Sequence, residues 1–255
     1  MLKKILRKTG TILLNLSEGQ ATNSSIQPDM IEPEFHDIYA KCKEYTMTSA
    51  ARMYGLFKAV EYVINAKIPG DFVECGVWRG GSSMLIAYML ANRKITDRKI
   101  YLYDTFEGMS APSKEDVDIT GKNADNLLDE GKNQKETSVW CLADLSDVQN
   151  NLALTGIHPQ QVIYIKGKVE ETIPGESPRA TLALLRLDTD WYESTRHELV
   201  HLYPQLSAAG VLIIDDYGHW TGCRKAVDEY FAAGKQKPIY LSRVDYTGRI
   251  GIKSF

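Results

Sequence analysis

The 255-residue chain lacks the sequence features of several large classes of protein. It has no stretch of about 20 apolar residues, so no membrane-spanning helix is expected. Its four cysteines lie far apart without a CxxC pair, which argues against a zinc knuckle or disulfide framework and favours a reducing cytoplasm. It has no excess of basic residues: 30 Lys and Arg against 33 Asp and Glu give a net charge of -3. We therefore expect no binding to a nucleic-acid backbone.

The first 48 residues differ in character from the rest. Residues 1–16 (MLKKILRKTGTILLNL) have a basic start, but their apolar runs are too short for a signal peptide, so we interpret them as a basic amphipathic helix. Such a helix suits a surface or dimer contact, with a membrane-surface anchor as the alternative. Residues 17–33 are polar with two prolines and indicate a linker or mobile cover. We divide the chain into an N-terminal helical extension or lid, 1–48, and one domain, 49–255, and expect a homodimer.

From residue 49 onward, short apolar runs alternate with amphipathic segments. Strands are expected at 71–77, 99–106, 161–167, 182–188 and 210–217. Helices are expected at 49–68, 80–94, 144–156, 192–207 and 223–234. This order predicts an α/β fold with a doubly wound, mostly parallel sheet. Residues 239–255 hold two more strand-like runs around a Tyr246-Thr247-Gly248 turn, which predicts a C-terminal antiparallel hairpin and seven strands in total.

A glycine-rich segment, ECGVWRGGSS (74–83), follows the first expected strand. In sheets of this kind ligands bind beyond the carboxyl ends of the strands. Gly76, Gly80 and Gly81 allow a tight turn and a close approach of backbone to ligand, and the helix start at Gly81 and Ser82 offers free amides. The spacing differs from the GxGxxG pattern of dinucleotide-binding proteins, so a pyrophosphate ligand is not indicated.

Two acids accompany this segment. Glu74 precedes the first glycine and would repel a phosphate but suit a cationic amino group. Asp104 ends the second strand, about 20 residues beyond the glycines, where an acid holds a ribose diol. A nucleoside that carries an amino acid and no phosphate meets both requirements, which describes S-adenosylmethionine. The alternative is that both acids only cap loops.

Four further aspartates follow the fourth and fifth expected strands. Asp188 and Asp190 end the fourth strand, in LRLDTDWYEST (185–195), and Asp215 and Asp216 end the fifth. Adjacent parallel strands lie about 5 Å apart, so these carboxylates converge at one edge of the sheet. They would repel one another without a cation, and hard oxygen ligands select Mg²⁺ or Ca²⁺. In the alternative they cap the following helices, as Asp190 is placed to do.

The segment HELVH (197–201) matches the H-E-x-x-H pattern of zinc peptidases. At helical spacing, His197 and His201 face away from the apolar stripe around Leu199, and no separate third ligand stands out. A zinc hydrolase is therefore the weakest of the functions that we consider.

Several segments resemble the macrocin O-methyltransferase (TylF) family, which methylates sugar hydroxyls of antibiotic glycosides. They are TMTS (46–49), IPGDFVECGVWRGGSS (68–83), YDTFEGM (103–109), LRLDTDWYEST (185–195) and GVLIIDDYGHWTGCRKAVDEYF (210–231). A more distant likeness is to the catechol and caffeoyl-CoA O-methyltransferases, in which GKVEETIP (167–174) corresponds to the adenine-side loop. The resemblance implies a class I methyltransferase, Rossmann-like fold.

The resemblance also implies a role for particular residues. Mg²⁺ would be held by Asp188, Asp215 and Asp216. Met47 and Thr48 would contact the methionine end of the donor, and Glu74 its amino group. Asp104 would hold its ribose, and Val169 with Glu170 its adenine. The catechol type has a lysine base three residues after the first metal ligand, where this chain has Trp191. The base proposed for the closer family corresponds to Asp190, with His219 as the second candidate.

We thus expect a Mg²⁺- and S-adenosylmethionine-dependent O-methyltransferase that acts on a sugar hydroxyl of a glycosylated natural product or related saccharide. A donor-binding module without metal-dependent transfer is the second hypothesis. The sequence does not identify the acceptor. Residues 106–140 are too long for a plain connection and indicate a lid over it. The aromatic residues near the strand ends suit an acceptor pocket or ordinary packing equally well: Trp78, Trp191, Tyr192 and Trp220.

Overall fold

A computed structural model describes residues 25–136, 138–234 and 236–254. The amphipathic helix predicted for 1–16, with the dimer or membrane contact assigned to it, and residues 17–24 of the predicted linker lie outside these ranges. Among the helices within them, none has both the length and the apolar composition that a membrane span requires.

A seven-stranded sheet forms the centre of the fold, in the order β3-β2-β1-β4-β5-β7-β6. Its strands are β1 (Asp71–Cys75), β2 (Ile100–Asp104), β3 (Val162–Lys166), β4 (Leu182–Leu187), β5 (Leu206–Ile214), β6 (Ser242–Arg243) and β7 (Arg249–Ile252). The first five are parallel to one another, whereas β7 runs antiparallel to both β5 and β6. The predicted doubly wound sheet and C-terminal hairpin are confirmed.

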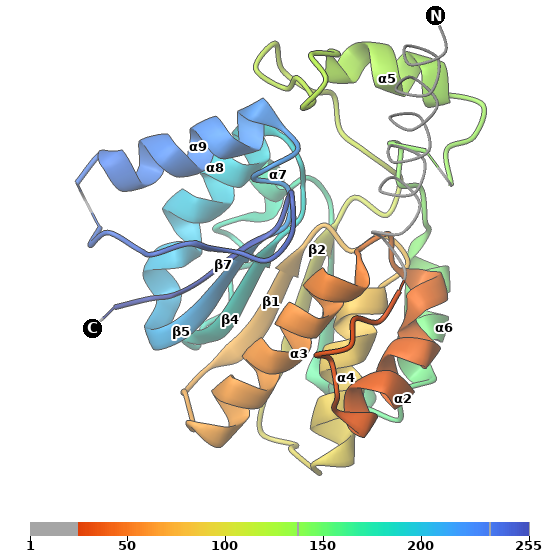
Figure 1. Ribbon diagram of the computed structural model, residues 1–255, viewed down its shortest axis with the longest axis vertical. Helices are drawn as coiled ribbons and strands as arrows, with labels where there is room; N and C mark the ends of the chain where they lie inside the picture. The colour runs from red at the N-terminus through yellow and green to blue at the C-terminus, as the bar shows by residue number, and fades with distance from the viewer. Residues whose placement is uncertain (1–24, 137, 235, 255) are drawn as a thin grey trace, which may run out of the picture.

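Four helices cover one face of the sheet, on the right in Figure 1. They are α2 (Pro33–Cys42), α3 (Ala50–Asn65), α4 (Gly81–Asn92) and α6 (Leu145–Ala153). The apolar side of α3 contributes Phe57 and Val60 to a core that also contains Phe72 of β1. Phe35 and Ile38 of α2 are buried in the same core. Residues 33–48 therefore pack as part of the domain, and the predicted boundary at residue 48 stays a prediction.

The opposite face is covered by α7 (Val169–Thr172), α8 (Tyr192–His201) and α9 (Thr221–Ala232) (Figure 1). Leu199 of α8 and Val227 of α9 pack with Leu185 and Leu212 of the central strands. A further short helix, α5 (Ala124–Gly131), lies beyond the strand ends, at the top of Figure 1. Three short 3-10 turns complete the fold at Lys43–Tyr45, Pro159–Gln161 and Tyr203–Gln205.

The helix predicted over 192–207 is wrong at its C-terminal end. α8 ends at His201, a 3-10 turn follows at Tyr203–Gln205, and β5 already begins at Leu206. Pro204 explains the break, because a proline disfavours helical backbone in the residue before it. The strand is correspondingly longer at its start than predicted, and Leu206 pairs with Leu182 of β4.

Candidate functional site

A cavity of about 390 Å³ opens at the carboxyl ends of the central strands. It is bordered by the segment before α3, the loops after β1, β2, β4 and β5, and the turn of the C-terminal hairpin. Eleven of the fourteen site residues predicted from the sequence line it: Met47, Thr48, Gly76, Ser82, Asp104, Val169, Glu170, Asp188, Asp190, Asp215 and Asp216. The remaining three, Glu74, Gly80 and Gly81, are not among the lining residues.

Asp104 holds a fixed orientation at the end of β2. Its Oδ2 accepts the amide of Val77 at 2.7 Å and that of Trp78 at 3.2 Å, and its Oδ1 accepts the amide of Phe106 at 2.7 Å. Burial raises the pKa of this carboxyl, while the hydrogen bonds from the three amides act in the opposite direction. The loops after β1 and β2 thus present a preorganised acceptor to the cavity.

Gly76 brings the ends of β1 and β4 together. It has φ +82°, and a Cβ at this position would lie 1.9 Å from the carbonyl oxygen of Asp188. The amide of Asp188 donates to the carbonyl of Cys75 at 2.8 Å, and that of Gly76 donates to the carbonyl of Tyr103 at 2.9 Å. The predicted tight turn therefore lets the backbone of Gly76 contact that of Asp188, which a side chain at position 76 would prevent.

Gly80 and Gly81 act through packing. Gly80 is the N-cap of α4 with φ +86°. A Cβ on Gly81 would lie 2.6 Å from the carbonyl oxygen of Tyr45, so its absence lets residues 45–48 rest on the start of α4. This contact places Met47 and Thr48 in the cavity wall.

Glu74 lies below the cavity and is 1% exposed. Its Oε1 accepts from Nη1 of Arg186 at 2.5 Å, and its Oε2 accepts from the hydroxyl of Ser83. Burial raises the pKa of Glu74, and the charge of Arg186 opposes this shift. Both carboxylate oxygens are thus occupied inside the protein.

Asp188, Asp215 and Asp216 form the carboxylate cluster that the strand ends predicted. One oxygen of each lies within 4.8 Å of the others, a separation that small side-chain rotations adapt to a shared Mg²⁺ or Ca²⁺. Oδ2 of Asp216 is buried and has no hydrogen-bond partner among the described residues. Burial and the neighbouring aspartates raise the pKa of Asp216 well above its ordinary value. A bound cation would supply the partner that Oδ2 of Asp216 lacks and would reduce the repulsion among the carboxylates.

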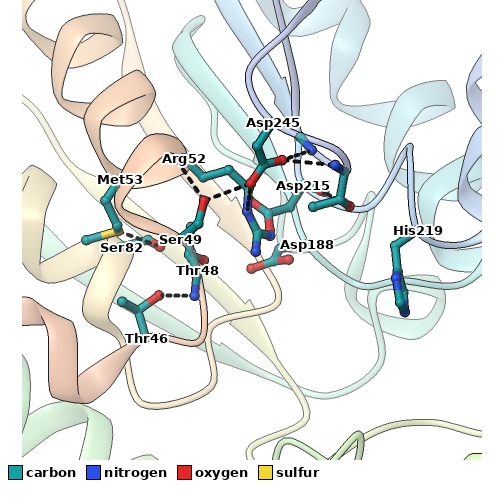
Figure 2. A network of polar contacts seen from close by, with 12 residues as sticks. Thr46, Thr48, Ser49, Arg52, Met53, Ser82, Asp188, Asp215, His219 and Asp245 are labelled. Atoms are coloured by element: carbon teal, nitrogen blue, oxygen red, sulfur yellow. Dashed lines mark hydrogen bonds and ion pairs between the residues drawn. The ribbon is translucent and has the colours of Figure 1, made fainter. Parts of the chain in front are cut away.

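Two arginines of this site were not predicted from the sequence. Arg186, in β4, is 2% exposed and pairs with Asp188 and Asp215, both at 2.7 Å. Arg52, in the first turn of α3, pairs with Asp215 and, at 3.1 Å, with Asp245 of the hairpin turn (Figure 2). These charges outweigh burial and hold the pKa of Asp215 below its ordinary value. A charged residue inside the apolar run LALLRLD was the signal for Arg186, whereas no sequence signal marks Arg52.

Asp190 has the left-handed backbone conformation, with φ +68°. Left-handed backbone is costly for a residue with a side chain and is concentrated at functional sites. Burial raises the pKa of Asp190 to about 7, and the carboxyl group of Asp216 lies close enough to share a hydrogen bond with it. A carboxyl with such a pKa can accept a proton near neutral pH.

His219 lies apart from the Asp188 and Asp215 carboxylates (Figure 2), at another part of the cavity wall. Its Nδ1 is 3.5 Å from the hydroxyl of Tyr246, and partial burial lowers its pKa. The geometry therefore favours Asp190 over His219 as the group beside the cluster.

Residues 106–140 are fastened to the strand-end loops. The indole of Trp191 donates to the carbonyl of Ser110 at 3.1 Å. The amide of Tyr192 donates to Oδ1 of Asp116 at 2.8 Å, and the amide of Thr221 donates to the carbonyl of Val117 at 2.9 Å. The first half of the segment is therefore anchored at the starts of α8 and α9.

The four aromatic residues divide between cavity and core. Trp78 and Trp220 line the cavity, whereas Trp191 is buried edge-on against Trp220, with ring centroids 4.9 Å apart. Tyr192 lies outside the cavity, where its hydroxyl donates to Glu229. The indole nitrogen of Trp78 is buried without a hydrogen-bond partner among the described residues, which leaves a donor for a ligand.

The HELVH segment forms no metal site within the described ranges. The rings of His197 and His201 contact each other at a tilt of 48°, with centroids 4.4 Å apart, and Nε2 of His197 lies 2.8 Å from the carbonyl oxygen of Ile173. Glu198 is fully buried and accepts from Thr189 at 2.9 Å. In those ranges, the only grouping of three metal-binding side chains is the aspartate cluster. The zinc-hydrolase alternative has no structural support.

The family model of the macrocin O-methyltransferases (TylF) matches residues 34–250. A demethyldecarbamoylnovobiocin O-methyltransferase from Streptomyces niveus is 36% identical over 188 residues, covering 74% of this chain and 68% of that protein. A tetracenomycin-C 4'-O-methyltransferase from Streptomyces olivaceus, which acts on a dimethoxyrhamnosyl derivative, is 36% identical over 205 residues, covering 80% of this chain and 74% of that protein.

Solved structures agree with these matches. The O-methyltransferase NovP superposes with a TM-score of 0.71 and 30% identity, over 83% of each chain. The calicheamicin methyltransferase CalS11 shares the fold, with a TM-score of 0.64 at 17% identity over 89% of this chain and 94% of that one. The chain therefore belongs to the macrocin O-methyltransferase family and is an O-methyltransferase with the class I fold.

Proposed function

We propose that this protein transfers a methyl group from S-adenosylmethionine to a hydroxyl of a sugar in a glycosylated natural product, with the help of Mg²⁺. One observation carries the proposal: the cavity that contains Asp104 also contains the carboxylates of Asp188, Asp215 and Asp216. A donor-binding surface and a candidate metal site thus share one space. The names of the relatives, which refer to novobiocin, tetracenomycin and mycinamicin derivatives, support the acceptor class.

The donor would lie across the ends of β1 and β2. Met47 and Thr48 would contact its methionine end, Asp104 its ribose, and Val169 with Glu170 its adenine, all from positions in the cavity wall. A direct bond from Glu74 to the donor's amino group would require Glu74 to exchange its partner Arg186 or Ser83. We therefore propose that Glu74 acts beneath the donor, as the counter-ion of Arg186.

The residues present fit a divalent cation. Asp188, Asp215 and Asp216 would hold it, and the unpaired Oδ2 of Asp216 is the clearest free ligand. A bound Mg²⁺ would lower the pKa of a coordinated hydroxyl and fix its direction. Asp190, beside Asp216, would accept the hydroxyl proton on its carboxylate as the methyl group moves. The chain's remaining task is to align the two reactants, which the anchored loops serve.

The acceptor would enter against residues 106–141 and the hairpin turn. Met109, Val139 and Trp220 give this wall apolar surface, and Ser110 and Tyr246 add hydroxyl groups. A mixture of apolar surface with a few polar groups suits a sugar attached to an apolar aglycone.

Calorimetry and a transfer assay test the proposal together. We expect S-adenosylhomocysteine to bind the purified chain, and labelled methyl groups from S-adenosylmethionine to reach desmethyl glycosides in a reaction that EDTA stops and MgCl₂ restores. Donor binding with no transfer to any glycoside would favour the donor-binding module. Transfer that EDTA does not affect would remove the metal from the mechanism.

A further inference from the structure

Arg186 is among the largest side chains that the protein buries completely. It lies in β4 directly beside Glu74 of β1, its partner in the parallel register. Burying a guanidinium is costly, and apolar residues of similar volume are often at least as stable as a buried ion pair. Stability alone therefore does not account for an arginine at this place.

The contacts of Arg186 link residues from four parts of the site. Its Nη1 reaches Oε1 of Glu74 at 2.5 Å and Oδ2 of Asp188 at 2.7 Å. Its Nη2 donates to Oδ1 of Asp215 at 2.7 Å and to the hydroxyl of Thr48 at 3.1 Å. One planar fork thus connects two candidate metal ligands with a residue of the candidate donor site.

A second set of contacts supports the same segment from the other side. The hydroxyl of Ser49 donates to Oδ2 of Asp245 at 2.7 Å, and Arg52 bridges Asp245 and Asp215 (Figure 2). Two arginines therefore connect the chain around Thr48 and Ser49 to Asp215. Arg186 reaches it at Thr48, and Arg52 lies one helical turn further along the chain. A change in the position of Asp215 reaches Thr48 through hydrogen bonds alone.

We propose that Arg186 is a positioning residue that couples metal binding to donor binding, an inference that rests on the proposed function. A metal that fixes Asp188 and Asp215 fixes the guanidinium, which in turn orders Thr48 for the donor. The protein then loses less conformational freedom when the donor binds. By linkage, the donor must strengthen metal binding by the same factor.

The test uses Mn²⁺ as the metal and S-adenosylhomocysteine as the donor analogue. Free Mn²⁺ is followed by electron paramagnetic resonance, with and without saturating S-adenosylhomocysteine, and the analogue is titrated calorimetrically with and without Mn²⁺. For the unaltered protein we expect each ligand to lower the Kd of the other at least about fivefold, in the usual range of allosteric coupling. Equal factors from the two titrations establish the coupling.

Three variants separate positioning from structural support. Arg186→Lys keeps the charge but not the fork, and we expect the Kd for Mn²⁺ to rise about tenfold or more and the coupling factor to fall to about 1. Thr48→Val removes one hydroxyl, the acceptor of the 3.1 Å bond from Arg186, and should lower the coupling factor without changing the Kd for Mn²⁺ alone. Arg93→Lys, which alters an ion pair with Glu34 on the far side of α4, is the control and should change neither quantity.

The outcomes are distinct. If the unaltered protein binds neither Mn²⁺ nor S-adenosylhomocysteine, the proposed function fails. If it binds both without coupling, or if Arg186→Lys or Thr48→Val keeps the full coupling factor, the inference about Arg186 is overturned while the proposed function stands. Should Arg186→Lys fail to fold, Thr48→Val decides alone, because it removes no charge from the core.

Discussion

Three properties of Asp190 support its proposed role as the base. It stands beside the carboxylate cluster, its backbone is held in the left-handed region at φ +68°, and burial raises its pKa to about 7. Strain of this kind is retained only where the surrounding structure enforces it. Trp191 on one side of it is buried against Trp220, and the amide of Trp191 donates to the carbonyl of Thr189 at 2.8 Å, across Asp190.

Asp190→Asn should separate proton transfer from binding. The amide has nearly the shape of the carboxyl but cannot accept a proton, so we expect turnover to fall at least about a hundredfold, the lower range for a general base. The Kd values for S-adenosylhomocysteine and Mn²⁺ should stay within about threefold of the unaltered protein. His219→Asn serves as the matched comparison. Near-normal turnover of Asp190→Asn, together with loss in His219→Asn, would transfer the role to His219.

Gly76→Ala should be strongly destabilising. An added Cβ meets the carbonyl of Asp188 at 1.9 Å and also imposes a side chain on backbone with φ +82°. Strain and overpacking together should lower the free energy of unfolding by about 3 kcal/mol or more, as measured by urea denaturation. Gly121→Ala is the control, since Gly121 has φ +90° but no atom within 4 Å of the added Cβ. It should cost only about 1 kcal/mol. Equal losses would show that the contact with Asp188 does not matter.

The acids of the site could be predicted from the sequence and their counter-charges could not. Acids after neighbouring parallel strands must converge, so Asp188, Asp215 and Asp216 follow from the order of strands. Arg52 lies on a helix whose rotation about its axis is set by tertiary packing, and a single polar helical position does not show which carboxylate it meets. The sequence did not show that Glu74 has a buried partner in Arg186, and its contact with the donor's amino group stays a prediction.

At the scale of elements, the segment 106–140 is more than a cover. Its buried residue Asp116 accepts the amide and hydroxyl of Ser113 and the amide of Tyr192, so it joins the segment to the first turn of α8. Gly222 of α9 packs against the same carboxylate, since a Cβ there would lie 1.9 Å from Oδ1. The segment thus shares its anchor with the loop that carries Asp190.

Asp116→Ala should release this anchor. The buried amide of Tyr192 loses its partner, which costs about 1 to 3 kcal/mol. Hydrogen exchange followed by mass spectrometry should show faster exchange in residues 106–123 and at the start of α8, with β1 and β2 unchanged. Asp129→Ala, which alters an exposed residue of α5, is the control and should leave the exchange pattern as it was. Unchanged exchange in Asp116→Ala would mean that the other contacts of the segment suffice.

Element order was the most predictable part of the fold, and element ends were the least. The alternation of apolar runs determined the strands because a parallel sheet buries both faces. Helix α8 was extended too far because the apolar pattern continues through Leu202, Tyr203 and Leu206, although those residues belong to a 3-10 turn and a strand. The apolar pattern indicates which side chains are buried, and a continued helix would bury the same side chains as the observed turn and strand.

At the scale of the whole molecule, the sheet gathers negative charge at one edge. Five carboxyl groups gather there, those of Glu74, Asp188, Asp190, Asp215 and Asp216. Arg186 pairs with Glu74, Asp188 and Asp215, and Arg52 pairs with Asp215. Two arginines do not balance five acids, and burial and mutual repulsion raise the pKa of Asp188 and Asp216. The folded state thus holds an electrostatic cost that a bound divalent cation would reduce.

Cation binding should therefore stabilise the whole fold. A ligand that binds only the folded state at 100 times its Kd adds about 2.7 kcal/mol, which for a chain of this size raises Tm by about 5 to 10 °C. We expect MgCl₂ or MnCl₂ to produce this rise in differential scanning calorimetry and EDTA to reverse it. Asp216→Asn should abolish the rise, because Asp216 offers the unpaired oxygen. Asp97→Asn, in the exposed loop before β2 at the opposite edge of the sheet, should leave it intact. The same metal-dependent rise in both variants would place the cation elsewhere and separate the aspartate cluster from metal binding.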